Sequence, residues 1–137
     1  MKKFYAVVDT IVIVSGLITK NPTSPTKGVV DCLTDYVMVP LYCEEILEEY
    51  QEVLHREKFN LPENKIDEIL KLIKSDGIST QRKASKEQLP DPKDVVFYEV
   101  ALSKEDSFLV TGNIKHFPKV DFVVTPAEMM AIIEEDL

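Results

Sequence analysis

The stretch AVVDTIVIVSG, residues 6–16, places a single carboxylate inside a run of branched apolar residues. Asp9 is the only charged residue between Lys3 and Lys20. Burying an unpaired carboxylate costs several kcal/mol, which is comparable to the stability of a whole domain. A charge in this position therefore needs either a structural use or a chemical one.

The residues on both sides of Asp9 predict a strand followed by a helix. Residues 4–8, FYAVV, are apolar on both faces, as expected for a central strand of a parallel sheet. A helix begins at Asp9–Thr10 and ends before the loop of residues 19–28, which is rich in Pro, Ser and Thr. Similar patterns predict further strands at residues 36–41, 77–84, 107–111 and 121–125, and helices at residues 28–35, 44–57, 62–77, 91–104 and from Thr125 onward.

This alternation of strands and helices predicts one three-layer α/β/α domain, residues 1–137, with a central and mostly parallel sheet. A chain of 137 residues can bury a core without a metal or a disulfide. No apolar run reaches the roughly 18 residues of a transmembrane helix. Cys32 and Cys43 show no metal or redox spacing, which indicates a reducing cytoplasm.

The net charge of −8 results from 16 basic and 24 acidic residues. Such a balance argues against non-specific electrostatic binding of nucleic acid. It leaves three interpretations: a solvated surface, a basic partner, or a group of carboxylates that binds cations. The position of each acid along the predicted sheet can separate them.

Parallel sheets bind ligands beyond the carboxyl ends of their strands, so the acids that follow strands are candidates. Asp9 follows the first strand directly, and its alternative role is to cap the next helix. In the helix of residues 44–57, a rotation of about 100° per residue places Glu49 about 90° from the centre of the apolar face. The other glutamates of that helix face solvent at larger angles, among them Glu44, Glu45, Glu48 and Glu52.

Three further candidates come from the second half of the chain. Asp94 lies in the first turn of the predicted helix 91–104, after Asp91 as N-cap, and shares a face with Phe97 and Ala101. Its alternative role is to interact with the helix dipole. Thr111 and Asn113 lie in the turn VTGN that ends the strand of residues 107–111, where Asn supplies a neutral carbonyl.

Asp9, Glu49 and Asp94 thus belong to separate segments that can converge at one edge of the sheet. Three neighbouring carboxylates raise each other's pKa unless a cation lies among them. Oxygen ligands favour Mg²⁺ or Mn²⁺ over zinc. Such a metal activates water and neutralises charge on a phosphodiester, so hydrolysis of a nucleic acid is the natural chemistry.

Four segments carry a resemblance to a known family, in order and nearly end to end: VVDTIVIVSGLI, PLYCEEILEEYQEVLHREKF, LPDPKDVVFYEVALSKEDSFLVTGNIKHFP and VVTPAEMM. They resemble the PIN domain, and more narrowly the PIN-family toxins of prokaryotic toxin–antitoxin systems related to VapC. The resemblance implies a Mg²⁺- or Mn²⁺-dependent endoribonuclease that a cognate antitoxin inhibits. It implies catalytic roles for four residues, of which the three acids hold the metal: Asp9, Glu49, Asp94 and Asn113.

Other positions near the implied site either match the family or depart from it. Thr10 and Ser15 match polar positions of the family, with Thr111 as a further supporting residue. Ile11 stands where the family usually has Asn, and Asn113 stands where it often has Asp. Both departures weaken the expected metal site, since an amide and a negative charge are lost.

Lys115 and His116 follow the implied site and are candidates for phosphate contacts. His116 is also a candidate general base, and its alternative role is to pack on Phe117. The lysines at positions 20, 27, 83 and 86 either surround an RNA groove or are only solvated. The expected partners are an RNA substrate, a cognate antitoxin and a second copy of the chain, with no membrane. The apolar residues of 129–137 and of 63–75 form either a dimer face or part of the core.

Two function hypotheses of different classes follow from these residues. The first is a metal-dependent ribonuclease, the toxin of a type II toxin–antitoxin pair. The second is a catalytically weak or inactive PIN scaffold that binds protein or RNA, which Ile11, Asn113 and the net charge favour. A phosphoacceptor domain of the receiver type would need paired acids after the first strand, where Asp9 stands alone.

Overall fold

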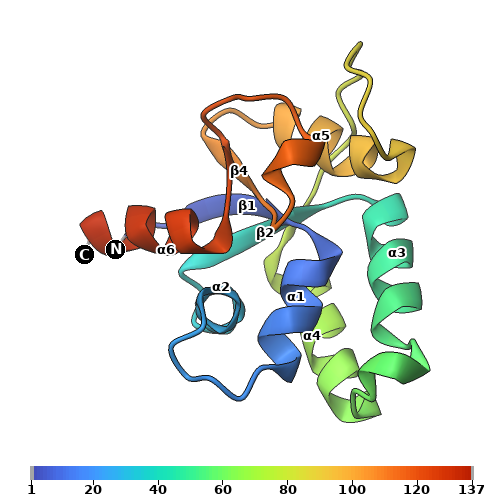
Figure 1. Cartoon of the computed structure of the whole chain (residues 1–137), viewed down its shortest axis with the longest axis vertical. Helices are drawn as coiled ribbons and strands as arrows, with labels where there is room; N and C mark the ends of the chain where they lie inside the picture. Colours follow the sequence, from blue (N-terminus) through green and yellow to red (C-terminus); the bar gives the residue numbers. More distant parts are fainter. Residues whose placement is uncertain (1, 137) are drawn as a thin grey trace.

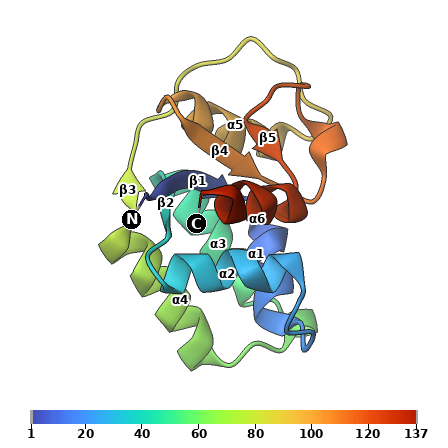
Figure 2. The same cartoon turned by 90° about the vertical axis from the view of Figure 1, so that its left-hand side faces the viewer.

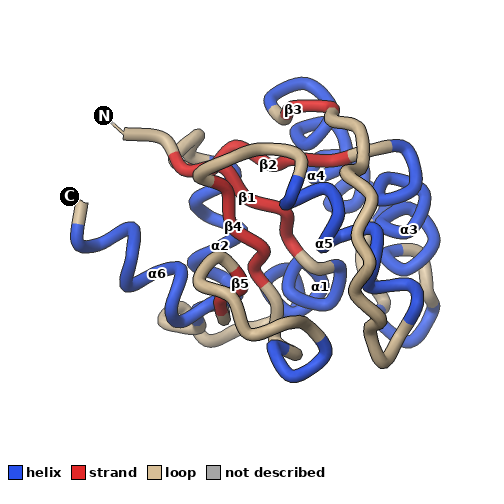
Figure 3. The backbone as a smooth tube through the Cα atoms, turned by 90° about the horizontal axis from the view of Figure 1, so that it is seen from above, coloured by secondary structure: helices blue, strands red, loops and turns tan. Residues whose placement is uncertain are grey.

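The computed structural model describes residues 2–136, which form one five-stranded sheet with helices on both faces. All pairings are parallel, and the strand order is β3–β2–β1–β4–β5 (Figure 3). The strands are β1 (Phe4–Val8), β2 (Met38–Tyr42), β3 (Ile78–Ser79), β4 (Ser107–Val110) and β5 (Val123–Val124). The first strand lies at the centre of the sheet, which explains why FYAVV is almost entirely buried.

The helices complete a three-layer α/β/α arrangement, as the sequence predicts. One face of the sheet carries α5, and the other carries α1, α2, α4 and α6, while α3 flanks the carboxyl ends of the strands (Figures 1 and 2). The helices are α1 (Thr10–Ile18), α2 (Pro25–Thr34), α3 (Glu44–Leu54), α4 (Glu63–Asp76), α5 (Val95–Leu102) and α6 (Pro126–Glu135). Short 3₁₀ turns span Glu57–Phe59, Pro92–Asp94 and Ile114–His116.

The two apolar faces considered for dimer formation belong largely to the core. In α4 the residues Ile66, Ile69, Leu70 and Ile73 are buried, and in α6 Met129 and Ile133 are buried. The N-terminus of α6 has the predicted capping box, in which Thr125 and Glu128 exchange hydrogen bonds with each other's backbone amide. Leu137 lies outside the described residues.

Two boundaries in the first third of the chain differ from the prediction. The helix expected at residues 28–35 begins at Pro25, because Ser24 occupies the N-cap position and Pro25 has the backbone angle that the first helical turn requires. The strand expected at residues 36–41 begins at Met38, because Tyr36 has a left-handed backbone with a φ of 61°. Neither difference moves a candidate site residue.

Other helices and strands are shorter than predicted. The helix expected at residues 44–57 ends at Leu54, and a 3₁₀ turn follows it. The helix expected at residues 91–104 is a 3₁₀ turn followed by α5, so Asp91 caps the turn and Asp94 occupies the N-cap position of α5. The edge strands span only residues 78–79 and 123–124, and the fourth strand ends at Val110.

None of the helices within residues 2–136 combines the length and the apolar character needed to cross a bilayer.

Candidate functional site

The register between β1 and β4 brings Asp9 and Thr111 together. Val8 pairs with Val110, and the backbone N–H of Asp9 donates to the Val110 carbonyl at 2.9 Å. The residues that follow the two strands, Asp9 after β1 and Thr111 after β4, therefore both lie at the carboxyl edge of the sheet. There the Thr111 hydroxyl donates to Oδ2 of Asp9 at 2.8 Å. The backbone N–H of Asn113 donates in turn to the Thr111 hydroxyl at 3.0 Å. Two adjacent strands thus fix the orientation of one carboxylate.

The Asp9 carboxylate lies at the N-terminus of the helix that follows it. Asp9 occupies the N-cap position of α1, but its side chain makes no capping hydrogen bond. The residue is only 8% exposed, and this burial raises the pKa of its carboxyl group, while the Thr111 hydrogen bond partly offsets the shift. The fold therefore places a carboxylate where its charged form is disfavoured, and the backbone N–H groups of Ile11 and Thr10 at the start of α1 offset only part of that cost.

Helix α3 presents Glu49 to the same edge. The Thr10 hydroxyl donates to Oε2 of Glu49, and the hydroxyl of the neighbouring Tyr50 donates to the Val8 carbonyl. Tyr50 is fully buried, with its ring centroid 6.2 Å from that of Phe97. These contacts fix α3 against the end of β1. Partial burial raises the pKa of the Glu49 carboxyl group, and the charge of nearby Asp9 raises it further.

The turn before α5 supplies the third acid. The Asp91 carboxylate accepts a hydrogen bond from the backbone N–H of Lys93 at 3.0 Å, and the side chain of Asp94 is 18% exposed. Nδ1 of His116 lies 3.4 Å from Oδ2 of Asp94. Burial raises the pKa of the Asp94 carboxyl group, and the charges of Asp9 and Asp91 raise it further.

One cavity of about 250 Å³ joins these side chains at the carboxyl edge of the sheet. Its lining contains all four residues with an implied catalytic role, together with Thr10 and His116. Thr111 is fully buried beneath Asp9, and Ser15 and Lys115 lie outside the lining. The complete lining is Asp9, Thr10, Ile11, Glu49, Glu52, Val53, Arg56, Asp91, Lys93, Asp94, Asn113 and His116.

Four charged residues of the cavity are not among the residues that the sequence predicts for the site. Glu52 belongs to the predicted solvated face of its helix and Asp91 is predicted only as an N-cap, while the sequence pattern singles out neither Arg56 nor Lys93. The helical spacing could have identified two of them. Glu52 and Arg56 follow Glu49 at i+3 and i+7, so they share its side of the helix. The four lysines expected around an RNA groove do not line this cavity, and Lys27 forms an ion pair with Asp31 at 2.8 Å.

We call Asp9, Glu49 and Asp94 the three site carboxylates and test whether they suit a divalent cation. Across residues 2–136, no three His, Cys, Asp or Glu side chains lie close enough together to ligate one ion as they stand. The chemistry of the donors nevertheless fits Mg²⁺ or Mn²⁺, since all are oxygen ligands. Their pKa values are raised by burial, with Asp9 also raising those of the other two. A cation would relieve this strain.

Comparison with known proteins identifies the family. The family model described as PIN domain matches residues 5–115, a range that contains the three site carboxylates and Asn113. No curated protein and no solved structure gives a significant match to the chain. PIN domains have a nuclease-type fold, generally act as nucleases and typically use divalent metals. Since the match covers most of the sequence, the chain belongs to the PIN domain family.

Proposed function

We propose that this protein is a Mg²⁺- or Mn²⁺-dependent endoribonuclease that hydrolyses phosphodiester bonds in RNA. The observation that carries the proposal is the meeting of three carboxylates, from β1, α3 and the turn before α5, in one cavity of a PIN domain. Carboxylates kept close together and partly buried are costly for stability. A site that binds a cation gives this arrangement a use.

In the proposed reaction, a divalent cation held by Asp9, Glu49 and Asp94 would polarise the attacking water and neutralise charge on the phosphate. The Thr111 hydroxyl orients the Asp9 carboxylate, and the Thr10 hydroxyl orients that of Glu49. Because a hydroxyl that donates to a carboxylate favours its ionised form, both contacts prepare the acids to act as ligands. We assign Asn113 an assisting role, in which its amide contacts substrate or water without adding charge.

The proposal is tested by cleavage of single-stranded RNA with Mn²⁺ or Mg²⁺. We expect Asp9→Ala to abolish cleavage, and Glu49→Gln to reduce it by about two orders of magnitude, as for other groups that stabilise transition-state charge. Glu48→Gln is the matched control, because Glu48 is an exposed neighbour on the same helix. Cleavage that persists unchanged in Asp9→Ala would identify a contaminating nuclease and refute the proposal.

For the biological role, we propose the toxin of a type II toxin–antitoxin pair, which acts in the cytoplasm as a homodimer. The resemblance to toxins related to VapC supports this role. The test is whether a small DNA-binding protein encoded next to this chain co-purifies with it and suppresses RNA cleavage. Sedimentation measures the number of copies, and a monomer at micromolar concentration would contradict the homodimer.

A second candidate function is a PIN scaffold that binds protein or RNA without cleavage. The favouring observation is Ile11, whose apolar side chain is 48% exposed and lines the cavity beside the neutral Asn113. Calorimetric titration of Mn²⁺ into the wild type and the double variant Ile11→Asn, Asn113→Asp discriminates the two functions. The scaffold predicts binding by the double variant alone, whereas equally tight binding by both excludes the idea that these residues weaken the site.

A further inference from the structure

The charges of the site cavity are arranged unevenly. Five carboxylates and two permanently charged cations line it, so its interior repels a polyanion unless a cation is bound. The cations come from different segments, with Arg56 two residues after the end of α3 and Lys93 in the turn before α5. A nucleic acid strand that enters the cavity would therefore meet a cation from each of these two segments together with the three site carboxylates.

We propose that Arg56 and Lys93 bind the phosphates that flank the scissile bond, and that Glu52 competes with the substrate for Arg56. This inference rests on the proposed function and identifies the part of the site that holds the RNA backbone. In the free protein, Nη2 of Arg56 lies 3.1 Å from Oε1 of Glu52. The Arg56 guanidinium is therefore already paired with a carboxylate that a phosphate can replace.

The exchange of partners is favourable for physical reasons. The Arg56 and Glu52 side chains are 41% and 66% exposed, and ion pairs between such exposed groups on one helix are weak. A phosphate oxygen pair can bind the planar guanidinium through two parallel hydrogen bonds, which is a stronger contact. The released Glu52 carboxylate returns to water at little cost, since it is mostly solvated already.

Lys93 is prepared for the same task on the turn before α5. Its backbone N–H is held by the Asp91 carboxylate at 3.0 Å, which fixes the turn, while its side chain remains exposed. Its charge lies near enough to Glu49 to lower the pKa of that carboxyl group. The ammonium group is thus positioned beside the site carboxylates, where a phosphate that contacts a cation held by them would also lie.

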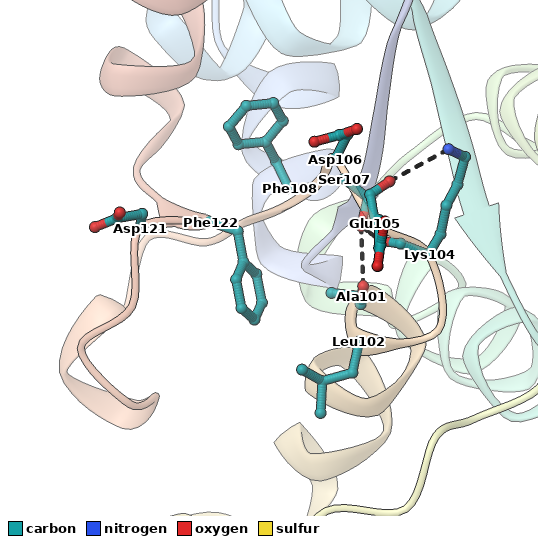
Figure 4. Close-up of a pocket in the computed structure, with 9 residues that line it drawn as sticks. All are labelled: Ala101, Leu102, Lys104, Glu105, Asp106, Ser107, Phe108, Asp121 and Phe122. Atoms are coloured by element: carbon teal, nitrogen blue, oxygen red, sulfur yellow. Dashed lines mark hydrogen bonds between the residues drawn. The ribbon is translucent and has the colours of Figure 1, made fainter.

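A second cavity provides the matched control. It has a volume of about 400 Å³ and lies at the amino end of β4, on the opposite edge of the sheet (Figure 4). Lys104 contributes to its lining together with the acids Glu105, Asp106 and Asp121. Removal of the Lys104 charge changes the net charge of the protein by the same amount as removal of Arg56 or Lys93, but far from the site carboxylates.

The experiment measures binding of a fluorescein-labelled single-stranded RNA of mixed sequence by anisotropy, in an Asp9→Asn background that prevents cleavage. We expect Arg56→Gln and Lys93→Gln each to weaken binding about five- to tenfold, and each to reduce the slope of log K against log salt by about 0.7. Glu52→Gln should tighten binding about two- to fivefold, because it frees Arg56. Lys104→Gln should leave binding unchanged.

The combined variant Glu52→Gln, Arg56→Gln completes a double-mutant cycle with the two single variants. If Glu52 acts by competing for Arg56, its substitution has no effect once Arg56 is absent. An equal gain in both backgrounds would overturn the competition, and equal losses for Arg56→Gln and Lys104→Gln would overturn the phosphate contact. If RNA binds as described but the wild type never cleaves it, the proposed nuclease function fails while this inference stands.

Discussion

The Tyr50 hydroxyl is the best single atom with which to test how the site is held together. The residue is fully buried, and its hydroxyl donates to the carbonyl of Val8, the last residue of β1. In a trans peptide the N–H of Asp9 and the C=O of Val8 point in opposite directions. Because that N–H points to β4, the Val8 carbonyl points toward β2, where the pairing ends at Ala6 and Pro40. Tyr50 thus takes the place of a strand partner.

Tyr50→Phe removes this hydrogen bond and preserves the ring. The Val8 carbonyl then remains buried without a partner, because the residue is only 1% exposed. Leaving such a group unsatisfied costs about 1–3 kcal/mol. The packing of the ring against Phe97 persists, so no cavity term is added. We therefore expect the free energy of unfolding to fall by about 1–3 kcal/mol.

Urea unfolding of the wild type and the variant measures this difference. Tyr98→Phe is the control, because Tyr98 is also a buried aromatic residue, stacked on Phe122 at 5.7 Å, and it has no hydroxyl hydrogen bond within residues 2–136. We expect the control to change stability by less than about 0.5 kcal/mol. Equal losses in both variants, or no loss in Tyr50→Phe, would refute the assignment of Tyr50 as the clamp between α3 and β1.

Further predictions concern charge. The three site carboxylates have raised pKa values in the folded chain, so between about pH 4 and those raised values the folded state binds more protons than the unfolded state. Their contribution to metal-free stability is thus present at low pH and lost as pH rises. Urea unfolding from pH 4 to 7 should show Asp9→Asn gaining stability relative to the wild type; a constant difference would contradict this. Arg82→Gln should lower the free energy of unfolding by about 2 kcal/mol, because it leaves the buried Glu99 carboxylate without its cation. Glu45→Gln, which removes the exposed partner of the same arginine, should lower it by less than about 0.5 kcal/mol. Thermal unfolding measures both changes. Equal costs for these two variants would argue against a special role of Glu99.

Much of the fold could be predicted because local patterns and tertiary structure agree. The apolar run before Asp9, the helical periodicity of α3 and α4, and the capping signal at Thr125 all specify elements that the structure contains. Where tertiary contacts determine the end of an element, the prediction from local pattern was wrong. The strand expected at residues 77–84 ends at Ser79, because Arg82 turns toward Glu99 and Glu45 and draws the chain away from the sheet.

Local sequence patterns likewise predicted some residues of the candidate site and missed others. Asp9 could be singled out as a lone charge after a strand, and Glu49 could be ranked by its angle on α3, and both line the cavity. Their catalytic and metal-binding roles remain predictions. Lys93 was missed because the turn that carries it was expected to be regular helix. Arg56 was missed because only the glutamates of the predicted helix 44–57 were ranked by angle, although Arg56 follows Glu49 at i+7.

The central position of β1 has a consequence for synthesis of the chain. Of the five strands of this sheet, β1 is synthesised before the others, yet it is placed between β2 and β4, and the acid that follows it is oriented by a threonine 102 positions later. A nascent or truncated product that stops before Thr111 lacks β4's carboxyl end and the partner of Asp9. No such fragment can assemble the cavity, so any activity of the site arises only after most of the chain has been translated, and premature termination yields inert products.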